Sequence, residues 1–158
     1  DPRPFVENNV AIALTLLEYA KSLPDLKTFI QIGTDEVYGP ALEGVNHPEW
    51  SPQLPSNPYS ASKSAQEAIA ISYWRTFNVP LIITNSNNII GPFQNPEKFI
   101  PKIIDKAKKR EPIIIHAVNG VVGNRVWNPV GNVASALVYI INNVKEEHSQ
   151  FPRVPLNL

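Results

Sequence analysis

Apolar residues recur along the chain with two spacings, one typical of amphipathic helices and the other of buried strands. Apolar residues that recur every three to four positions predict helices, and Pro24 ends the first of these segments. The predicted helices are 5–23, 59–77, 99–109 and 133–144. Short runs rich in apolar β-branched residues predict strands. These are 28–32, 81–87 and 112–118. Residues 40–57 are rich in proline and predict a long loop.

The alternation of helices and strands predicts an α/β fold with a mainly parallel sheet, because apolar strands covered on both faces need helical crossovers. Ligands of such sheets bind beyond the carboxyl ends of the strands. Residues 33–39 and 85–92 directly follow two of the predicted strands, so we expect both segments at that edge.

The composition limits the kinds of partner that the chain can attract. Lysine and arginine together number 14, and aspartate and glutamate together also number 14. The chain therefore has no net charge that would attract nucleic acid or an anionic membrane. No apolar run approaches the roughly 20 residues of a membrane span, and we expect a soluble, cytoplasmic protein. With no cysteine and three scattered histidines, no metal site is predicted. The chain lacks methionine and begins at Asp1, so we expect a processed chain or a piece of a longer one.

Two pairs of side chains carry candidate chemistry. Tyr59 and Lys63 are four residues apart on a predicted helix and so share one face. A nearby ammonium lowers the pKa of a phenol, which is about 10 when unperturbed, and would make Tyr59 a usable base. Asp35 and Glu36 place two carboxylates just after the strand 28–32, at the edge where ligands of such sheets bind. Ordinary interpretations also exist: a surface stacking pair for the first, and a turn cap with a solvated neighbour for the second.

The motifs TDEVYG, PYSASK and TNSNNIIGPFQNPEKFIP occur in this order, and through them the chain resembles the extended short-chain dehydrogenase/reductases, the NAD-dependent epimerases and dehydratases. Within that family it is most similar to the nucleotide-sugar 4,6-dehydratases of the dTDP-glucose type. The resemblance implies a partial Rossmann-like, doubly wound parallel sheet that lacks the family's first strands. Residues 1–116 would form the C-terminal half of an NAD-binding domain, and residues 117–158 a divergent, truncated substrate-side region.

The resemblance also implies roles for the catalytic candidates. Tyr59 would take the proton of the sugar's 4-hydroxyl while hydride passes to NAD, and Lys63 would tune Tyr59 and contact the cofactor ribose. Thr34 would hydrogen-bond the 4-oxygen. In the loss of water, Asp35 would be the general acid and Glu36 the general base. The implied substrate is a dTDP- or UDP-hexose.

Further residues match family positions that hold the cofactor or the substrate. Asn9 matches an asparagine that helps to fix the catalytic lysine through water, although an ordinary helix position explains it equally well. Asn88 matches the segment at the substrate's diphosphate, and Arg125 matches an arginine that binds this group. The segment expected to line the base pocket contains Glu97, Lys98 and Phe99.

Departures from the family pattern leave other functions open. Val126 and Gly131 stand where the family has acidic residues, and the glycine-rich dinucleotide turn is absent, so we expect it upstream. An inactive homologue that binds a nucleotide sugar or a partner subunit fits these departures. A 4-epimerase or a decarboxylase would use Tyr59 and Lys63 without the acid pair. Family members pair through the helices that match residues 5–22 and 59–77, so the resemblance implies a homodimer or a higher oligomer.

Overall fold

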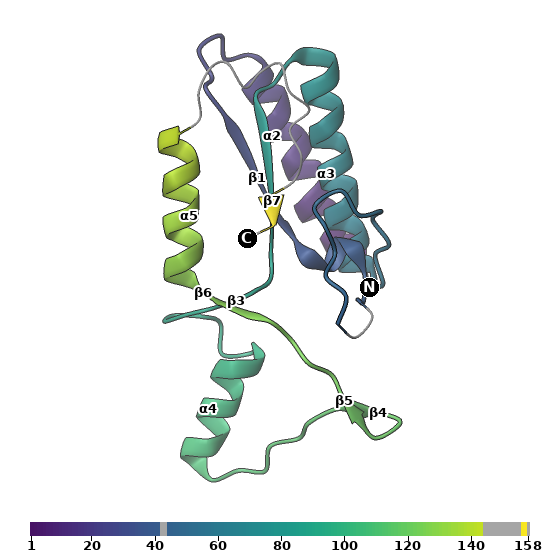
Figure 1. Cartoon of the computed structure of the whole chain (residues 1–158), viewed down its shortest axis with the longest axis vertical. Coiled ribbons are helices and arrows are strands. Elements are labelled where there is room, and N and C mark those ends of the chain that lie inside the picture. Colours follow the sequence, from purple (N-terminus) through teal and green to yellow (C-terminus); the bar gives the residue numbers. More distant parts are fainter. Residues whose placement is uncertain (42–43, 144–155, 158) are drawn as a thin grey trace. The chain divides into compact units, whose positions relative to one another are not determined.

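The chain folds into two α/β units. Unit 1 consists of residues 1–87 and 136–158, and unit 2 of residues 88–135. The computed structural model describes residues 1–41, 44–143 and 156–157, and Figure 1 labels its helices and strands. The division at residue 116 that the sequence suggested stays a prediction.

The sheet of unit 1 is parallel. β1 (Phe29–Thr34) and β2 (Leu81–Ser86) pair residue by residue over their whole length. β7 (Leu156–Asn157) pairs with β2, also in parallel. Because β1 and β2 run in the same direction and in register, their carboxyl ends lie side by side.

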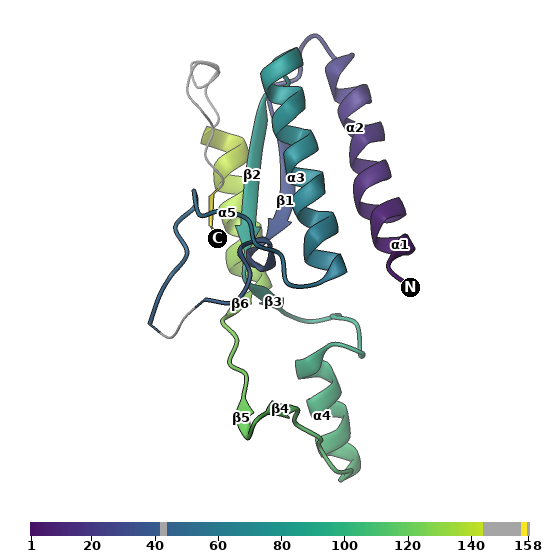
Figure 2. The same cartoon turned by 90° about the vertical axis from the view of Figure 1, so that its right-hand side faces the viewer.

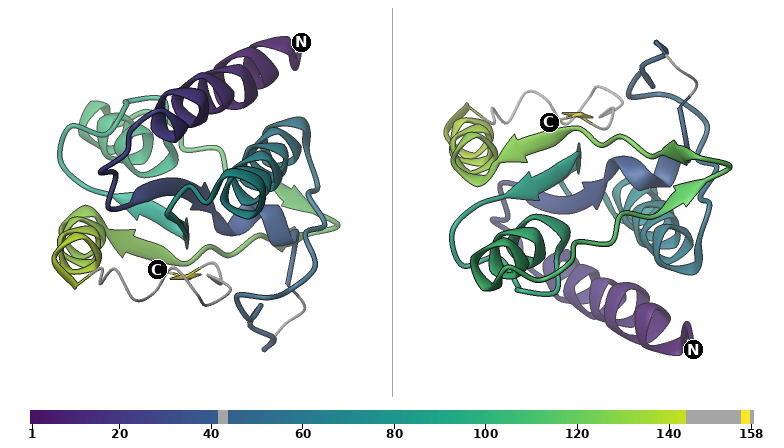
Figure 3. Two further views of the ribbon diagram at one scale, coloured as in Figure 1. Left: turned by 90° about the horizontal axis from the view of Figure 1, so that it is seen from above. Right: turned by 90° about the horizontal axis from the view of Figure 1, so that it is seen from below.

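Two long helical segments cover one face of this sheet. The first segment is continuous through α1 (Arg3–Phe5), a π-helical stretch, η1 (Val6–Ala11), and α2 (Ile12–Lys21). The second is α3 (Pro58–Phe77). Figures 2 and 3 show α2 and α3 side by side, with the part of α5 (Val130–Asn143) that belongs to unit 1 on the opposite face. The hydrophobic core between these helices and the sheet contains Leu17, Ala20, Ala70, Tyr73, Val79, Leu81 and Ile83.

Unit 2 is built from short elements. β3 (Asn88–Ile90) pairs in parallel with β6 (Trp127–Pro129). Between them in the chain lie α4 (Phe99–Lys109) and an antiparallel hairpin of β4 (Ala117–Val118) and β5 (Val121–Val122). The hairpin turns at Asn119 and Gly120, whose φ values of 52° and 77° are the left-handed ones that Asn-Gly turns favour.

The structure confirms the predicted α/β fold with parallel strands but corrects one element. The strand predicted over 112–118 is wrong, because only Ala117–Val118 form a strand and residues 111–116 form neither helix nor strand. The isoleucines that suggested a buried strand line a pocket instead. The helix predicted over 99–109 has these same bounds, whereas position 144, at the end of the last predicted helix, lies outside the described residues.

Candidate functional site

The acid pair lies directly beyond the carboxyl end of β1. Thr34 is the last residue of this strand, and Asp35 and Glu36 open the 3₁₀ helix η2 (Asp35–Tyr38). The Thr34 hydroxyl accepts a hydrogen bond from the Glu36 N–H and donates one to Asp35 Oδ1, both over 3.4 Å. Since parallel sheets bind ligands at this edge, three polar side chains gather where a ligand is expected.

Helix α3 starts next to the acid pair through a capping box. The Asn57 side-chain oxygen accepts a hydrogen bond from the Ser60 N–H at 2.9 Å, and the Asn57 N–H donates to the Ser60 hydroxyl at 3.2 Å. The Asn57 amide nitrogen also donates to Glu36 Oε2 at 3.4 Å. One residue therefore both caps the helix that carries Tyr59 and contacts Glu36.

Tyr59 is half-buried at the start of α3, with 37% of its surface exposed. Its ring meets the Phe5 ring edge to face, with the centroids 5.7 Å apart. Burial raises the pKa of the Tyr59 phenol above its usual value, and the negative charges of Glu36 and Asp35 raise this pKa further. The lowering of this pKa that the sequence led us to expect from Lys63 is therefore wrong.

The direction of the Lys63 ammonium explains this outcome. Lys63 Nζ donates to the backbone oxygen of Ile32 at 2.7 Å and to Gln66 Oε1 at 2.5 Å. Burial lowers the pKa of Lys63, and the carboxyl group of Glu67 opposes that lowering when it is ionised. The ammonium is thus tied to the end of β1 and to its own helix.

Asn9 contacts the helix that carries Lys63. Its amide nitrogen donates to the Ser62 hydroxyl at 2.9 Å, and this hydroxyl donates to the backbone oxygen of Tyr59 at 2.7 Å. Asn9 therefore joins η1 to the first turn of α3 beside the candidate catalytic residues. Its expected effect on Lys63 through water stays a prediction.

The residues at this edge offer a hydrogen-bond donor that fits the ribose of an NAD molecule. An ammonium has three N–H donors, and the described residues accept two hydrogen bonds from Lys63, so one donor is left for a ribose hydroxyl. The half-buried Tyr59 phenol lies one helical turn before Lys63. The pyrophosphate of NAD would need a glycine-rich turn, and no such turn occurs in the sequence.

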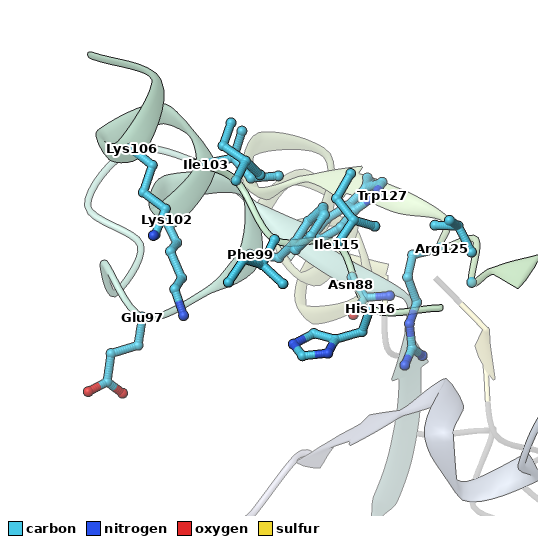
Figure 4. Close-up of a pocket in the computed structure, with 14 residues that line it drawn as sticks. Asn88, Glu97, Phe99, Lys102, Ile103, Lys106, Ile115, His116, Arg125 and Trp127 are labelled. Atoms are coloured by element: carbon cyan, nitrogen blue, oxygen red, sulfur yellow. The ribbon is translucent and has the colours of Figure 1, made fainter. Parts of the chain in front are cut away.

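Unit 2 contains a pocket of about 620 Å³, shown in Figure 4. The rings of Phe99 and Trp127 stack there, with the centroids 6.2 Å apart and the planes 15° from parallel. The side chains of Lys102, His116 and Arg125 extend to the same side of the pocket in Figure 4. The pocket therefore combines aromatic faces with cationic groups, a combination that suits a nucleotide.

Most of the predicted substrate residues gather at this pocket. Asn88, Glu97, Phe99 and Arg125 line it. Lys98 does not line it; this residue is exposed and stands directly before α4. Among the described residues Arg125 has no ion-pair partner, so its guanidinium can bind an anion.

Several residues of both units escaped the sequence analysis. Lys102 and Lys106 line the pocket, and their spacing of four on a helix was the available signal. Asn57 was taken as part of a loop, although an asparagine before proline at a helix start is a capping signal. Glu67 was not singled out, although it follows Lys63 by one helical turn.

Two kinds of feature are absent from the described part of the chain. No helix there is long and apolar enough to cross a membrane. No three metal-binding side chains come together among the described residues either.

Comparison with known proteins gives one family. Residues 1–151 match the model of the NAD dependent epimerase/dehydratase family. A dTDP-glucose 4,6-dehydratase of Xanthomonas campestris is 39% identical over 123 residues, which are 73% of this chain and 35% of that protein. A trifunctional UDP-glucose 4,6-dehydratase/UDP-4-keto-6-deoxy-D-glucose 3,5-epimerase/UDP-4-keto-L-rhamnose-reductase of Arabidopsis thaliana is 37% identical over 146 residues, 91% of this chain and 22% of that protein. The chain thus spans well under half the length of these relatives.

Solved structures show the same fold. A dTDP-glucose 4,6-dehydratase of Bacillus anthracis in complex with NAD gives a TM-score of 0.88 at 30% identity, over 100% of this chain and 48% of that chain. A UDP-glucuronic acid 4-epimerase of Bacillus cereus gives a TM-score of 0.81 at 23% identity, over 97% of this chain and 45% of that chain, and supports the fold alone. The predicted partial Rossmann-like fold is confirmed.

Proposed function

The chain belongs to the NAD-dependent epimerase/dehydratase family, and from this premise we propose that it carries the catalytic residues of a nucleotide-sugar 4,6-dehydratase of the dTDP-glucose type. The acid pair carries the proposal. Asp35 and Glu36 lie beyond the carboxyl end of β1, and Asn57 joins Glu36 to the start of the helix that bears Tyr59. Dehydratases among the relatives support the choice of reaction.

The side chains at this edge suffice for the proton transfers of such a reaction. NAD, whose ribose Lys63 would hold, would supply the acceptor and later the donor of the hydride that leaves carbon 4 of the sugar and returns to carbon 6. Tyr59 removes the proton of the 4-hydroxyl, and Thr34 donates a hydrogen bond to the 4-oxygen. The ketone at carbon 4 acidifies the proton on carbon 5, which Glu36 takes, while Asp35 protonates the 6-hydroxyl so that the bond from carbon 6 to oxygen breaks and water leaves. Glu36 then returns the proton to carbon 5 when hydride adds to carbon 6.

We propose that the pocket of unit 2 binds the nucleotide of the substrate. Phe99 and Trp127 offer aromatic faces to a pyrimidine, and Arg125 offers a fork of donors to diphosphate oxygens. We expect this pocket to determine whether the protein prefers dTDP or UDP. A binding titration with each nucleotide measures the preference.

The Asp35→Asn, Glu36→Gln double variant tests the proposed reaction in the protein that contains this chain. We expect the variant to oxidise carbon 4 but not to release water, because both amides lack a transferable proton or a basic oxygen at neutral pH. Reduced cofactor should accumulate in the absorbance spectrum without any 4-keto-6-deoxy product. Tyr59→Phe is the control, because it should prevent oxidation as well. Normal dehydration by the double variant would refute the assignment.

Binding of a nucleotide sugar without turnover is the second candidate function. Val126 and Gly131, both exposed, stand where the family has acidic residues. The raised pKa of Tyr59 also leaves less of the phenolate, the form that acts as the base, at neutral pH in the protein alone. This candidate predicts saturable binding of a sugar nucleotide with no spectral change of the cofactor. A 4-epimerase or decarboxylase would instead convert other sugar nucleotides, which substrate screening detects.

We also propose that the protein is at least a homodimer that pairs through α2 and α3. Exposed apolar residues share the outer side of the first helical segment, namely Phe5, Ile12, Leu16 and Tyr19. On α3 the exposed small residues Ala61, Ala65 and Ala68 lie on one side. Both sides suit contact with a second helix pair.

A further inference from the structure

Glu67 is a fully buried carboxyl group for which the proposed reaction has no use. It lies on α3, one turn after Lys63, and has 0% of its surface exposed. Burial of an acid is costly unless its oxygens are paired or it holds a proton. The surroundings of its two oxygens therefore indicate its protonation state.

Only one of these oxygens has a donor among the described residues. Gln53 Nε2 donates to Glu67 Oε2 at 2.5 Å, whereas Glu67 Oε1 is buried without a hydrogen-bond partner. The Asn85 amide nitrogen donates to the Tyr38 hydroxyl at 2.9 Å, so its oxygen is left, also buried and without a partner. A Cβ atom placed on Gly33 would collide with both unpaired oxygens, which shows that they lie against the same point of β1.

Two facing acceptors are satisfied together if a proton lies between them. We propose that Glu67 is held as a neutral carboxylic acid whose Oε1–H donates to Asn85 Oδ1, and that it acts in this form as a positioning residue for the site of Tyr59 and Lys63. The role rests on the proposed function, because positioning presupposes that these residues are catalytic. The proton itself can be measured without turnover.

Three segments around the site meet at this carboxyl group. Gln53 belongs to the long loop 40–57. Gly33 lies in β1, directly before Thr34 and the acid pair. Asn85 lies near the end of β2 and reaches Tyr38, the last residue of η2. A neutral Glu67 therefore joins α3 to the strand ends and to the loop without a buried charge.

The charged and titratable groups that face this network come from three elements. On α3, the positive charge of Lys63 acts on Glu67. From η2, Tyr38 is linked to Glu67 through Asn85, and its hydroxyl donates to the backbone oxygen of Glu49 in the loop at 3.2 Å. The His47 ring stacks on the Tyr38 ring, with the centroids 5.6 Å apart.

The acid strength of Glu67 agrees with the geometry. Burial raises the pKa of Glu67 from 4.5 to about 7, while the amide groups of Asn85 and Gln53 and the positive charge of Lys63 lower it by less. The folded state therefore binds the proton more tightly than the unfolded state. The stability that this proton contributes is fully present below pH 4.5 and is lost as the pH rises to about 7.

Carbon-13 NMR of the protein labelled in its glutamate carboxyl groups tests the protonation directly. The signal that disappears in Glu67→Gln belongs to Glu67. We expect it to titrate with a midpoint near 7 rather than near 4.5. A midpoint near 4.5 overturns the proposal whether or not the protein has activity.

Thermal unfolding of matched variants tests the linkage. Glu67→Gln reproduces the neutral acid, since its amide can donate to Asn85 and its oxygen can accept from Gln53. We expect the melting temperature of the wild type to fall between pH 4.5 and about 7 by more than that of Glu67→Gln. His47→Gln should keep the wild-type fall. The proposal is contradicted if the melting temperatures of the wild type and Glu67→Gln fall equally over this pH range. It is also contradicted if the melting temperature of His47→Gln no longer falls.

The rate assay of the proposed reaction tests the positioning role. Glu67→Ala should lower kcat at least about tenfold, which corresponds to about 1.4 kcal/mol, and Glu67→Gln should restore most of it. Failure of Glu67→Gln to restore the rate overturns the role. If the wild type itself has no turnover, the proposed function fails, while the NMR titration still decides the state of Glu67.

Discussion

Gly33 shows, at the scale of a residue, why the edge of the sheet tolerates so little change. A Cβ atom at this position would collide with Asn85 Oδ1 and Glu67 Oε1 and lie 3.0 Å from the backbone oxygen of Thr84. Both side chains are buried, so neither can move aside. We expect Gly33→Ala to lower the free energy of unfolding by about 1–3 kcal/mol, as overpacking does, measured by urea denaturation.

Gly131→Ala is the matched control for this prediction. Gly131 is exposed on α5, and a Cβ there meets nothing within 4 Å. Alanine favours a helix over glycine, so the control should stabilise the protein by about 0.5–1 kcal/mol. Equal effects of the two substitutions would mean that the space around Gly33 does not limit its side chain.

Helix α3 is the element on which the candidate site depends, and Asn57 determines where it begins. Asn57→Ala removes the oxygen that accepts from the Ser60 N–H. We expect a loss of about 1 kcal/mol in the free energy of unfolding, typical of a lost N-cap, and a fall in dehydratase rate because Glu36 loses its contact with the amide.

Asn57→Ser separates the two effects of this substitution. A serine hydroxyl still caps the helix but has no amide to donate to Glu36. Stability should return to nearly that of the wild type while the rate stays low. Full recovery of the rate would show that the contact between Asn57 and Glu36 has no role in catalysis.

At the scale of the whole molecule, we propose that the outer sides of α2 and α3 govern association. Leu16 is half-exposed on α2, and Ala65 is exposed on α3. We expect the wild type to sediment as a dimer or a larger species, and the Leu16→Arg, Ala65→Arg variant to sediment as a smaller one, because two buried charges would be costly. Analytical ultracentrifugation measures both.

Tyr139→Arg controls for the general effect of an added charge. Tyr139 is exposed on α5, on the other face of the sheet from α2 and α3. Its substitution should leave the sedimentation of the wild type unchanged. A monomeric wild type, or a change with Tyr139→Arg alone, would contradict pairing through α2 and α3.

The sequence by itself determined most of the elements and the place of the acid pair. Periodicity predicted the bounds of α4, and the position of Asp35 and Glu36 directly after an apolar strand predicted the edge where they lie. Such features depend on residues that are neighbours in the chain. This local dependence makes them readable without a structure.

Only the tertiary structure decided the pKa values at the site and whether an apolar run forms a strand or lines a pocket. Burial raises the pKa of Tyr59, and the acid pair raises it further instead of Lys63 lowering it, because η2 and the start of α3 meet through Asn57. The isoleucines before β4 line a pocket and do not join a sheet. The proton that we assign to Glu67 depends on its contact with Gln53 and on its place beside β1 and β2. These properties arise between segments distant in sequence, so folding alone brings their charges and acceptors within reach of one another.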